Sequence, residues 1–214
     1  MRGRCVPNPS ITRGFMVDAQ AFDDALSSIF AVPDPFAPEL AVGVGRAALL
    51  YPTDYRFPPE LIPALSEVSQ RHGEAELYIA FSEVEVASSL RDNGFGPVRS
   101  IQFPLTFDPY LQLVEDPLQN AHVTGNATWA ALFSNDEFGV IAGAEAFLAD
   151  LETRLLATFE AQAIAFLRGR KEDHERFGFG IEWIPPAIRA VFGPEHGSRL
   201  LAATGLETEP RSET

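Results

Sequence analysis

The sequence predicts an α+β fold, in which an antiparallel or mixed sheet of five to six strands is covered by one long helix and several shorter helices. The composition and two kinds of hydrophobic periodicity support this prediction. Hydrophobic residues make up 46% of the 214 residues and include 17 phenylalanines, which is enough apolar surface for one good-sized core. Apolar residues recur at every second position in some segments and at every third or fourth in others. We expect a single domain at 15–205, between a loose tail at 1–14 and a disordered acidic tail at 206–214.

The first half of the domain predicts helices that are bounded by proline and glycine. Asp18 can cap the first helix, and Pro33 ends it. The buried stripe of this helix consists of Phe22, Leu26, Ile29 and Phe30. Pro58 suits the first turn of a second helix, which Gly73 closes. A third, short helix is predicted at 84–90.

Strands are predicted where apolar residues alternate along the chain. The segment 76–83 is mostly apolar on both faces, which favours a central strand. The segment 101–105 contains Pro104, whose missing backbone N–H favours an edge strand. A further strand is predicted at 110–114.

The segment Gly43–Ala48 matches the G-x-G-x-x-A variant of the dinucleotide-binding fingerprint. In that motif the glycines open a helix of several turns, whose first turn holds a pyrophosphate. Pro52 follows Ala48 after only four residues, so such a helix could not continue. We therefore predict two short strands joined at Gly43–Arg46, and no cofactor.

The segment Thr128–Arg170 has the clearest local pattern in the chain. Its polar loop Ser134–Glu137 lies between two apolar segments and predicts a β-hairpin. After Gly143, apolar residues recur at three- and four-residue intervals, which predicts one long helix at about 144–168. The buried stripe of this helix consists of Leu148, Leu151, Leu155, Phe159, Ala163 and Phe166. Gly169 is expected to end it.

The remaining segments are shorter. The charged tract Lys171–Arg176 predicts a solvated connection, and the glycine-rich aromatic segment Phe177–Trp183 predicts a strand or a loop. Pro185 and Pro186 lead a helix, and the last helix is predicted at 194–203.

Local motifs for catalysis or metal binding are missing from the sequence. Cys5 is the only cysteine, so neither an intrachain disulfide nor a thiolate metal cluster can form. None of the four histidines lies three or four residues from another, which excludes the helical H-E-x-x-H zinc motif. The G-x-S-x-G nucleophile elbow, the P-loop and the EF-hand calcium loop are also missing. We therefore predict no catalytic residue, metal or cofactor, although a site assembled around His122 or His174 with a carboxylate stays an alternative.

The charge of the chain excludes some partners and favours others. It has 30 acidic residues against 16 basic ones, a net charge of −14. Nucleic-acid binding depends on neutralising phosphates with lysine and arginine, so this balance disfavours it, while it favours a basic protein partner or simply solubility. The sequence has neither a membrane-length apolar run nor a signal-peptide pattern, and we expect a cytoplasmic protein that does not enter a membrane.

The acidic residues are concentrated in one segment. From Asp108 to Glu160 the chain has nine carboxylates and one basic residue, Arg154. A solvated helix face with loops would account for this pattern. The alternative is an acidic surface that docks a basic protein, for which the candidate residues are Glu115, Asp116, Asn135, Asp136 and Glu137.

At the level of class, a small, acidic α+β protein without catalytic motifs resembles the immunity and antitoxin proteins with which bacteria neutralise their own toxins. The resemblance implies a non-enzymatic inhibitor or binding protein. Two alternatives stay open, a small hydrolase-like enzyme with a dispersed site and a structural or assembly subunit. The sequence does not predict the oligomeric state.

Overall fold

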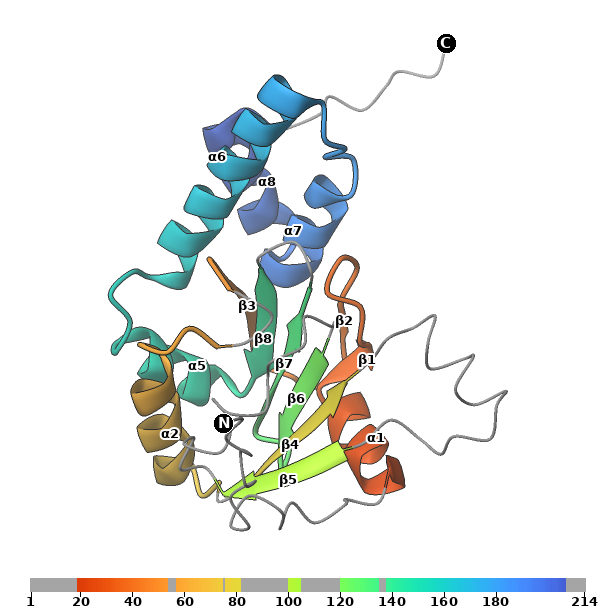
Figure 1. The fold of residues 1–214 in the computed structure, drawn as a ribbon, viewed down its shortest axis with the longest axis vertical. Helices are drawn as coiled ribbons and strands as arrows, with labels where there is room; N and C mark the ends of the chain where they lie inside the picture. The colour runs from red at the N-terminus through yellow and green to blue at the C-terminus, as the bar shows by residue number, and fades with distance from the viewer. Residues whose placement is uncertain are drawn as a thin grey trace, which may run out of the picture.

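The computed structural model describes residues 19–53, 57–74, 76–81, 100–104, 120–134 and 138–206. Across these ranges the chain forms six helices, a six-stranded antiparallel sheet and a separate two-stranded ribbon, which confirms the α+β class (Figure 1). The strands are β1 (Phe30–Val32), β2 (Glu39–Leu40), β3 (Arg46–Leu50), β4 (Glu76–Phe81), β5 (Ser100–Pro104), β6 (Asn120–Thr124), β7 (Trp129–Phe133) and β8 (Gly139–Gly143). The helices are α1 (Ala19–Ser27), α2 (Ile62–Arg71), α5 (Glu145–Glu152), α6 (Phe159–Phe177), α7 (Ile184–Phe192) and α8 (Pro194–Thr204).

The strands of the large sheet are arranged in the order β3-β8-β7-β6-β4-β5. The predicted hairpin is β7–β8, in which Ala131 pairs with Ile141. The predicted strand at 76–83 is β4, which lies in the interior of the sheet, and the strand that contains Pro104 is β5 at the edge. Strand β6 is not predicted by the sequence pattern. The predicted helix at 84–90 and strand at 110–114 lie outside the described residues.

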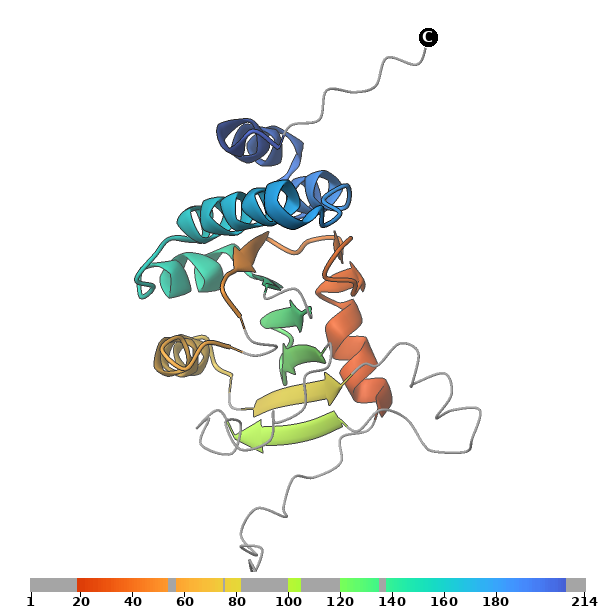
Figure 2. The ribbon, with the colours of Figure 1, turned by 45° about the horizontal axis from the view of Figure 1, so that its top comes forward.

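Helices cover both faces of the sheet, and β7 shows how its side chains divide between them. Ala130 and Leu132 join one buried cluster, whereas Trp129, Ala131 and Phe133 join the other. We call the first side the α6 face, because α6 packs on it together with α1 and α7, and the second side the α2 face, which α2 and α5 cover (Figure 1). Helix α8 packs against α6 and α7 from the outer side (Figure 2).

The prediction of one long helix at 144–168 is wrong. The chain forms two helices, because α5 ends at Glu152 and α6 begins at Phe159. Leu148 packs on the α2 face and Phe166 on the α6 face, so the chain must cross from one face to the other between them. The crossing takes place beside the edge strand β3, and the Thr158 hydroxyl then caps α6 by accepting a hydrogen bond from the Ala161 N–H at 3.1 Å.

The predicted end of this helix at Gly169 is also wrong. Helix α6 continues to Phe177, so the charged tract Lys171–Arg176 is helical and does not form a loop. Gly169 serves a packing role instead, because a Cβ atom there would lie only 3.2 Å from the Tyr51 hydroxyl. The helix ends at Gly178, which has the left-handed φ of 75°.

The segment with the dinucleotide-binding pattern opens a strand. Gly45 precedes β3, and a Cβ atom on Gly45 would lie 2.6 Å from the backbone nitrogen of Glu145. The glycine therefore allows the first turn of α5 to approach the chain, and the prediction of a strand is confirmed. The first helix is shorter than predicted, because Phe30 starts β1. None of the helices in the described ranges has the length and apolar character needed to cross a membrane.

Candidate functional site

The predicted partner-binding residues cannot be placed, because Glu115, Asp116, Asn135, Asp136 and Glu137 all lie outside the described residues. The structure does show where the loop that carries the last three begins and ends. The Ser134 N–H donates a hydrogen bond to the Phe138 carbonyl at 3.0 Å, so the two ends of this hairpin loop are held together. The acidic surface therefore stays a prediction.

An open pocket of about 480 Å³ lies beside the first turn of α6. We call it the α6 pocket. It brings together the start of β3, the end of α5, the first turns of α6 and the junction of α7 with α8. Its lining combines charged, polar and apolar side chains, namely Arg46, Glu152, Thr158, Glu160, Ala161, Ile164, Phe192 and His196.

Arg46 and Glu152 line the side of this pocket whose contacts connect β3 with α6. The Arg46 guanidinium lies 3.0 Å from Glu152 Oε2 and 3.7 Å from Glu145 Oε1, and it lies over the ring of Phe159. The second Glu152 oxygen accepts a hydrogen bond from the Phe159 N–H at 2.9 Å. Glu152 thus ties the start of β3 to the start of α6, and two carboxylates balance the charge of Arg46. This balance makes the arginine a poor anion-binding group.

His196 and Glu160 form the other side of the pocket. His196 Nε2 lies 3.4 Å from Glu160 Oε2, and the ring of Phe192 meets the imidazole edge-on. Both side chains are partly exposed, so solvent can reach the pair. A histidine beside a carboxylate in an open pocket is an arrangement that can accept or donate a proton.

The histidines named from the sequence lie elsewhere. His122 on β6 is fully buried between the rings of Phe57 and Phe133, and burial lowers the pKa of its imidazole to about 3. It is therefore a neutral core residue at neutral pH. His174 is exposed on α6, and its Nδ1 lies 2.6 Å from the Phe179 carbonyl. His196 and Glu160 are 36 positions apart in the sequence, so only the packing of α8 on α6 brings them together.

Across the described part of the chain, no group of three or more histidine, cysteine, aspartate or glutamate side chains is arranged to hold a metal ion. Comparison of the chain with protein-family models, curated proteins and solved structures found no match.

Proposed function

We propose that this chain is a non-enzymatic binding protein that docks a basic protein partner through an acidic surface, in the manner of bacterial immunity or antitoxin proteins. The net charge of −14 is the observation that carries the proposal. A protein with such an excess of carboxylates attracts cationic partners and repels nucleic acid.

The ion pairs within the described residues strengthen this argument. Arg71 lies 3.0 Å from Asp150, Arg154 lies 2.5 Å from Glu67, and Arg46 is held by two glutamates as described above. Exposed pairs of this kind add only about 0–1 kcal/mol each to stability. Their larger effect is that these arginines are paired with carboxylates of the same chain. The carboxylates in excess of the basic residues are then left to attract a partner.

Charge reversal at the hairpin tip tests the proposal. The variant Asp136→Lys/Glu137→Lys is compared with the matched control Glu172→Lys/Glu175→Lys, which makes the same charge change on an exposed part of α6. The partner is identified by pull-down from the native lysate, and its affinity is measured by calorimetry at several salt concentrations. We expect the tip variant to lose at least about tenfold in affinity, because two rim charges change sign.

The control should lose less, because it changes only the long-range field. Equal affinities of the tip variant and the wild type for the partner would contradict the proposed surface. Failure to recover any partner that responds to salt would contradict the proposed function itself.

A hydrolase-like enzyme is the second candidate, and the His196–Glu160 pair in the α6 pocket is the observation that favours it. Esters and phosphoesters with chromogenic leaving groups would test it. Turnover by the wild type that disappears in both His196→Gln and Glu160→Gln would support this function. Turnover that survives both changes would exclude the pair as its catalyst.

A further inference from the structure

A second concave feature lies where the chain crosses between the two faces of the sheet. It is a groove of about 140 Å³, which we call the crossover groove. Four segments form it, namely the residues that follow β3, the residues that precede α2, the connection from α5 to α6 and the first turn of α6. Its lining consists of Tyr51, Pro52, Pro58, Glu60, Leu61, Arg154, Leu155, Leu156, Ala157 and Gln162.

One side chain of the groove joins two of these segments. The Gln162 Oε1 accepts a hydrogen bond from the Tyr51 N–H at 3.0 Å, and the Gln162 Nε2 donates one to the Ala157 carbonyl at 3.1 Å. The amide of Gln162 thus joins the end of β3 to the crossing segment. A groove that is fixed in this way loses little conformational entropy when it is filled.

Apolar surface is exposed at the groove. Leu156, which lines the groove together with Leu155, Pro52 and Pro58, has 98% of its surface accessible to solvent. A single exposed leucine is common on protein surfaces. Here it stands at the rim of a preformed groove, where the methylene groups of an entering side chain would cover it.

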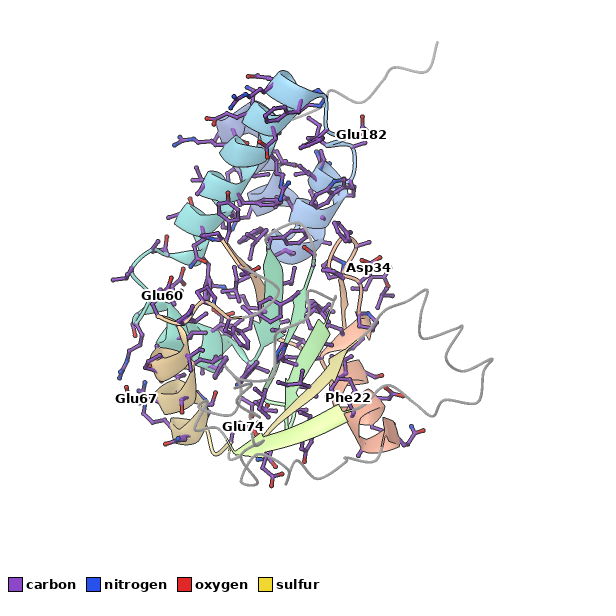
Figure 3. The ribbon with its side chains drawn as sticks, in the orientation of Figure 1. Phe22, Asp34, Glu60, Glu67, Glu74 and Glu182 are labelled. Atoms are coloured by element: carbon purple, nitrogen blue, oxygen red, sulfur yellow. The ribbon has the colours of Figure 1, made fainter. Side chains whose placement is uncertain are left out.

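Two charged side chains line the groove, Glu60 and Arg154. Glu60 is exposed and makes no ion pair with any residue that the structure describes. Arg154 also lines the groove, but Glu67 on α2 holds its guanidinium at 2.5 Å. Figure 3 shows Glu60 and Glu67 on the same side of the molecule, near the crossing segment and along α2. The carboxylate available to a ligand is therefore that of Glu60.

We propose that the crossover groove takes an arginine or lysine side chain of the basic protein partner. The methylene stem lies against Leu156 and the proline walls, and the cationic head pairs with Glu60. The volume fits a single side chain, because pockets for whole small-molecule ligands are usually about 300–1,000 Å³. This inference rests on the proposed function for the nature of the partner, but it names a surface separate from the hairpin tip.

A small probe tests the groove without the partner. The ¹⁵N-labelled chain is titrated with Nα-acetyl-arginine N-methylamide and, in parallel, with the citrulline analogue, which has nearly the same shape and no charge. We expect saturable shifts of the Leu156 and Ala157 amide signals with the arginine probe only. Glu60→Gln should weaken this binding by about fivefold, which corresponds to the loss of one exposed ion pair. The control Glu172→Gln, at an exposed position on α6, should leave it unchanged.

Two results would overturn the inference. One is the lack of saturable shifts at these amides, or equal shifts with citrulline. The other is a shift of the same signals with protein concentration alone, which would assign the groove to a second copy of this chain. Glu60 is exposed, so the Glu60→Gln variant should fold. If the arginine probe does not bind, the charge-reversal test of the hairpin tip is unaffected. If the charge reversal has no effect, the titration of the groove is likewise unaffected.

Discussion

The two faces of the sheet are packed in different ways. On the α2 face, polar groups are buried among the apolar ones. The Trp129 Nε1–H donates a hydrogen bond to the Ser69 hydroxyl at 2.9 Å, and both residues are fully buried. The ring of Trp129 also stacks on Phe147, and His122 lies against Phe57. This face therefore combines packing with specific polar contacts.

The α6 face is filled mainly by aliphatic side chains, with a group of aromatic rings packed among them. Phe138 on the sheet side contacts Phe166 of α6, with ring centroids 5.1 Å apart, and it stacks on Trp183 at 5.4 Å. Phe36 meets Trp183 edge-on. The stabilisation that such aromatic pairs give depends on the area they bury and on how the rings fit together.

The difference between the faces predicts different weaknesses. A core held by apolar packing responds to loss of volume, whereas a core with buried polar groups also responds to pH and to changes of single atoms. The α2 face should therefore carry the acid sensitivity of the fold.

The largest expected effect is that of His122. Its pKa is about 3 in the folded chain and about 6.5 when unfolded, so between these values the unfolded state binds more protons. The free energy of unfolding should then fall by about 1.4 kcal/mol per pH unit as the pH drops below 6.5. Urea unfolding at pH 7, 6, 5 and 4 should show that His122→Leu removes this slope.

A matched control separates titration from packing. Phe57→Leu disturbs the same ring cluster but removes no titratable group, so it should lower stability at every pH and keep the wild-type slope. If the free energy of unfolding falls equally with pH in the wild type and in His122→Leu, the acid sensitivity of the fold does not come from His122.

His122 also shows why the sequence does not predict β6. Asn120, His122 and Thr124 alternate with two small apolar residues, which resembles an exposed segment, yet His122 and Thr124 are buried. The polar character of a residue does not by itself reveal whether its side chain is buried in the core. The more apolar strands β4, β7 and β8 are predicted correctly, because their own pattern specifies burial.

The misread long helix has a related cause. Leu148 and Phe166 have the spacing of one helical stripe, but they point into cores on opposite faces of the sheet. Hydrophobic periodicity predicts that a residue is buried, but it does not predict which face of the sheet the residue packs against. The His196–Glu160 pair and the crossover groove arise from this crossing and from the packing of α8, so local sequence patterns contain no signal for them.

The second prediction concerns Glu74, at the end of the α2 face. The residue is only 2% exposed, and its carboxylate accepts hydrogen bonds from the N–H groups of Asn126 and Thr128 in the turn between β6 and β7. Glu74→Gln keeps one acceptor and places an NH₂ group against the other amide, which should cost about 1–3 kcal/mol. Urea unfolding measures the loss, and Glu60→Gln, at an exposed site, should change stability by less than about 0.5 kcal/mol. Equal effects of the two variants would remove Glu74 from the contacts that stabilise this face.

The smallest expected effect lies at the crossing between the two faces. Thr158→Ala removes the hydroxyl that caps α6 and should lower the free energy of unfolding by about 1 kcal/mol, whereas Thr158→Ser keeps the acceptor and should lower it less. Hydrogen exchange of the Ala161 amide is the more specific measurement, because the Thr158 hydroxyl is its hydrogen-bond acceptor. Faster exchange at Ala161 in the alanine variant alone would show that this cap fixes the start of α6. Unchanged exchange would mean that the opposite burial of Leu148 and Phe166 is enough to separate the two helices.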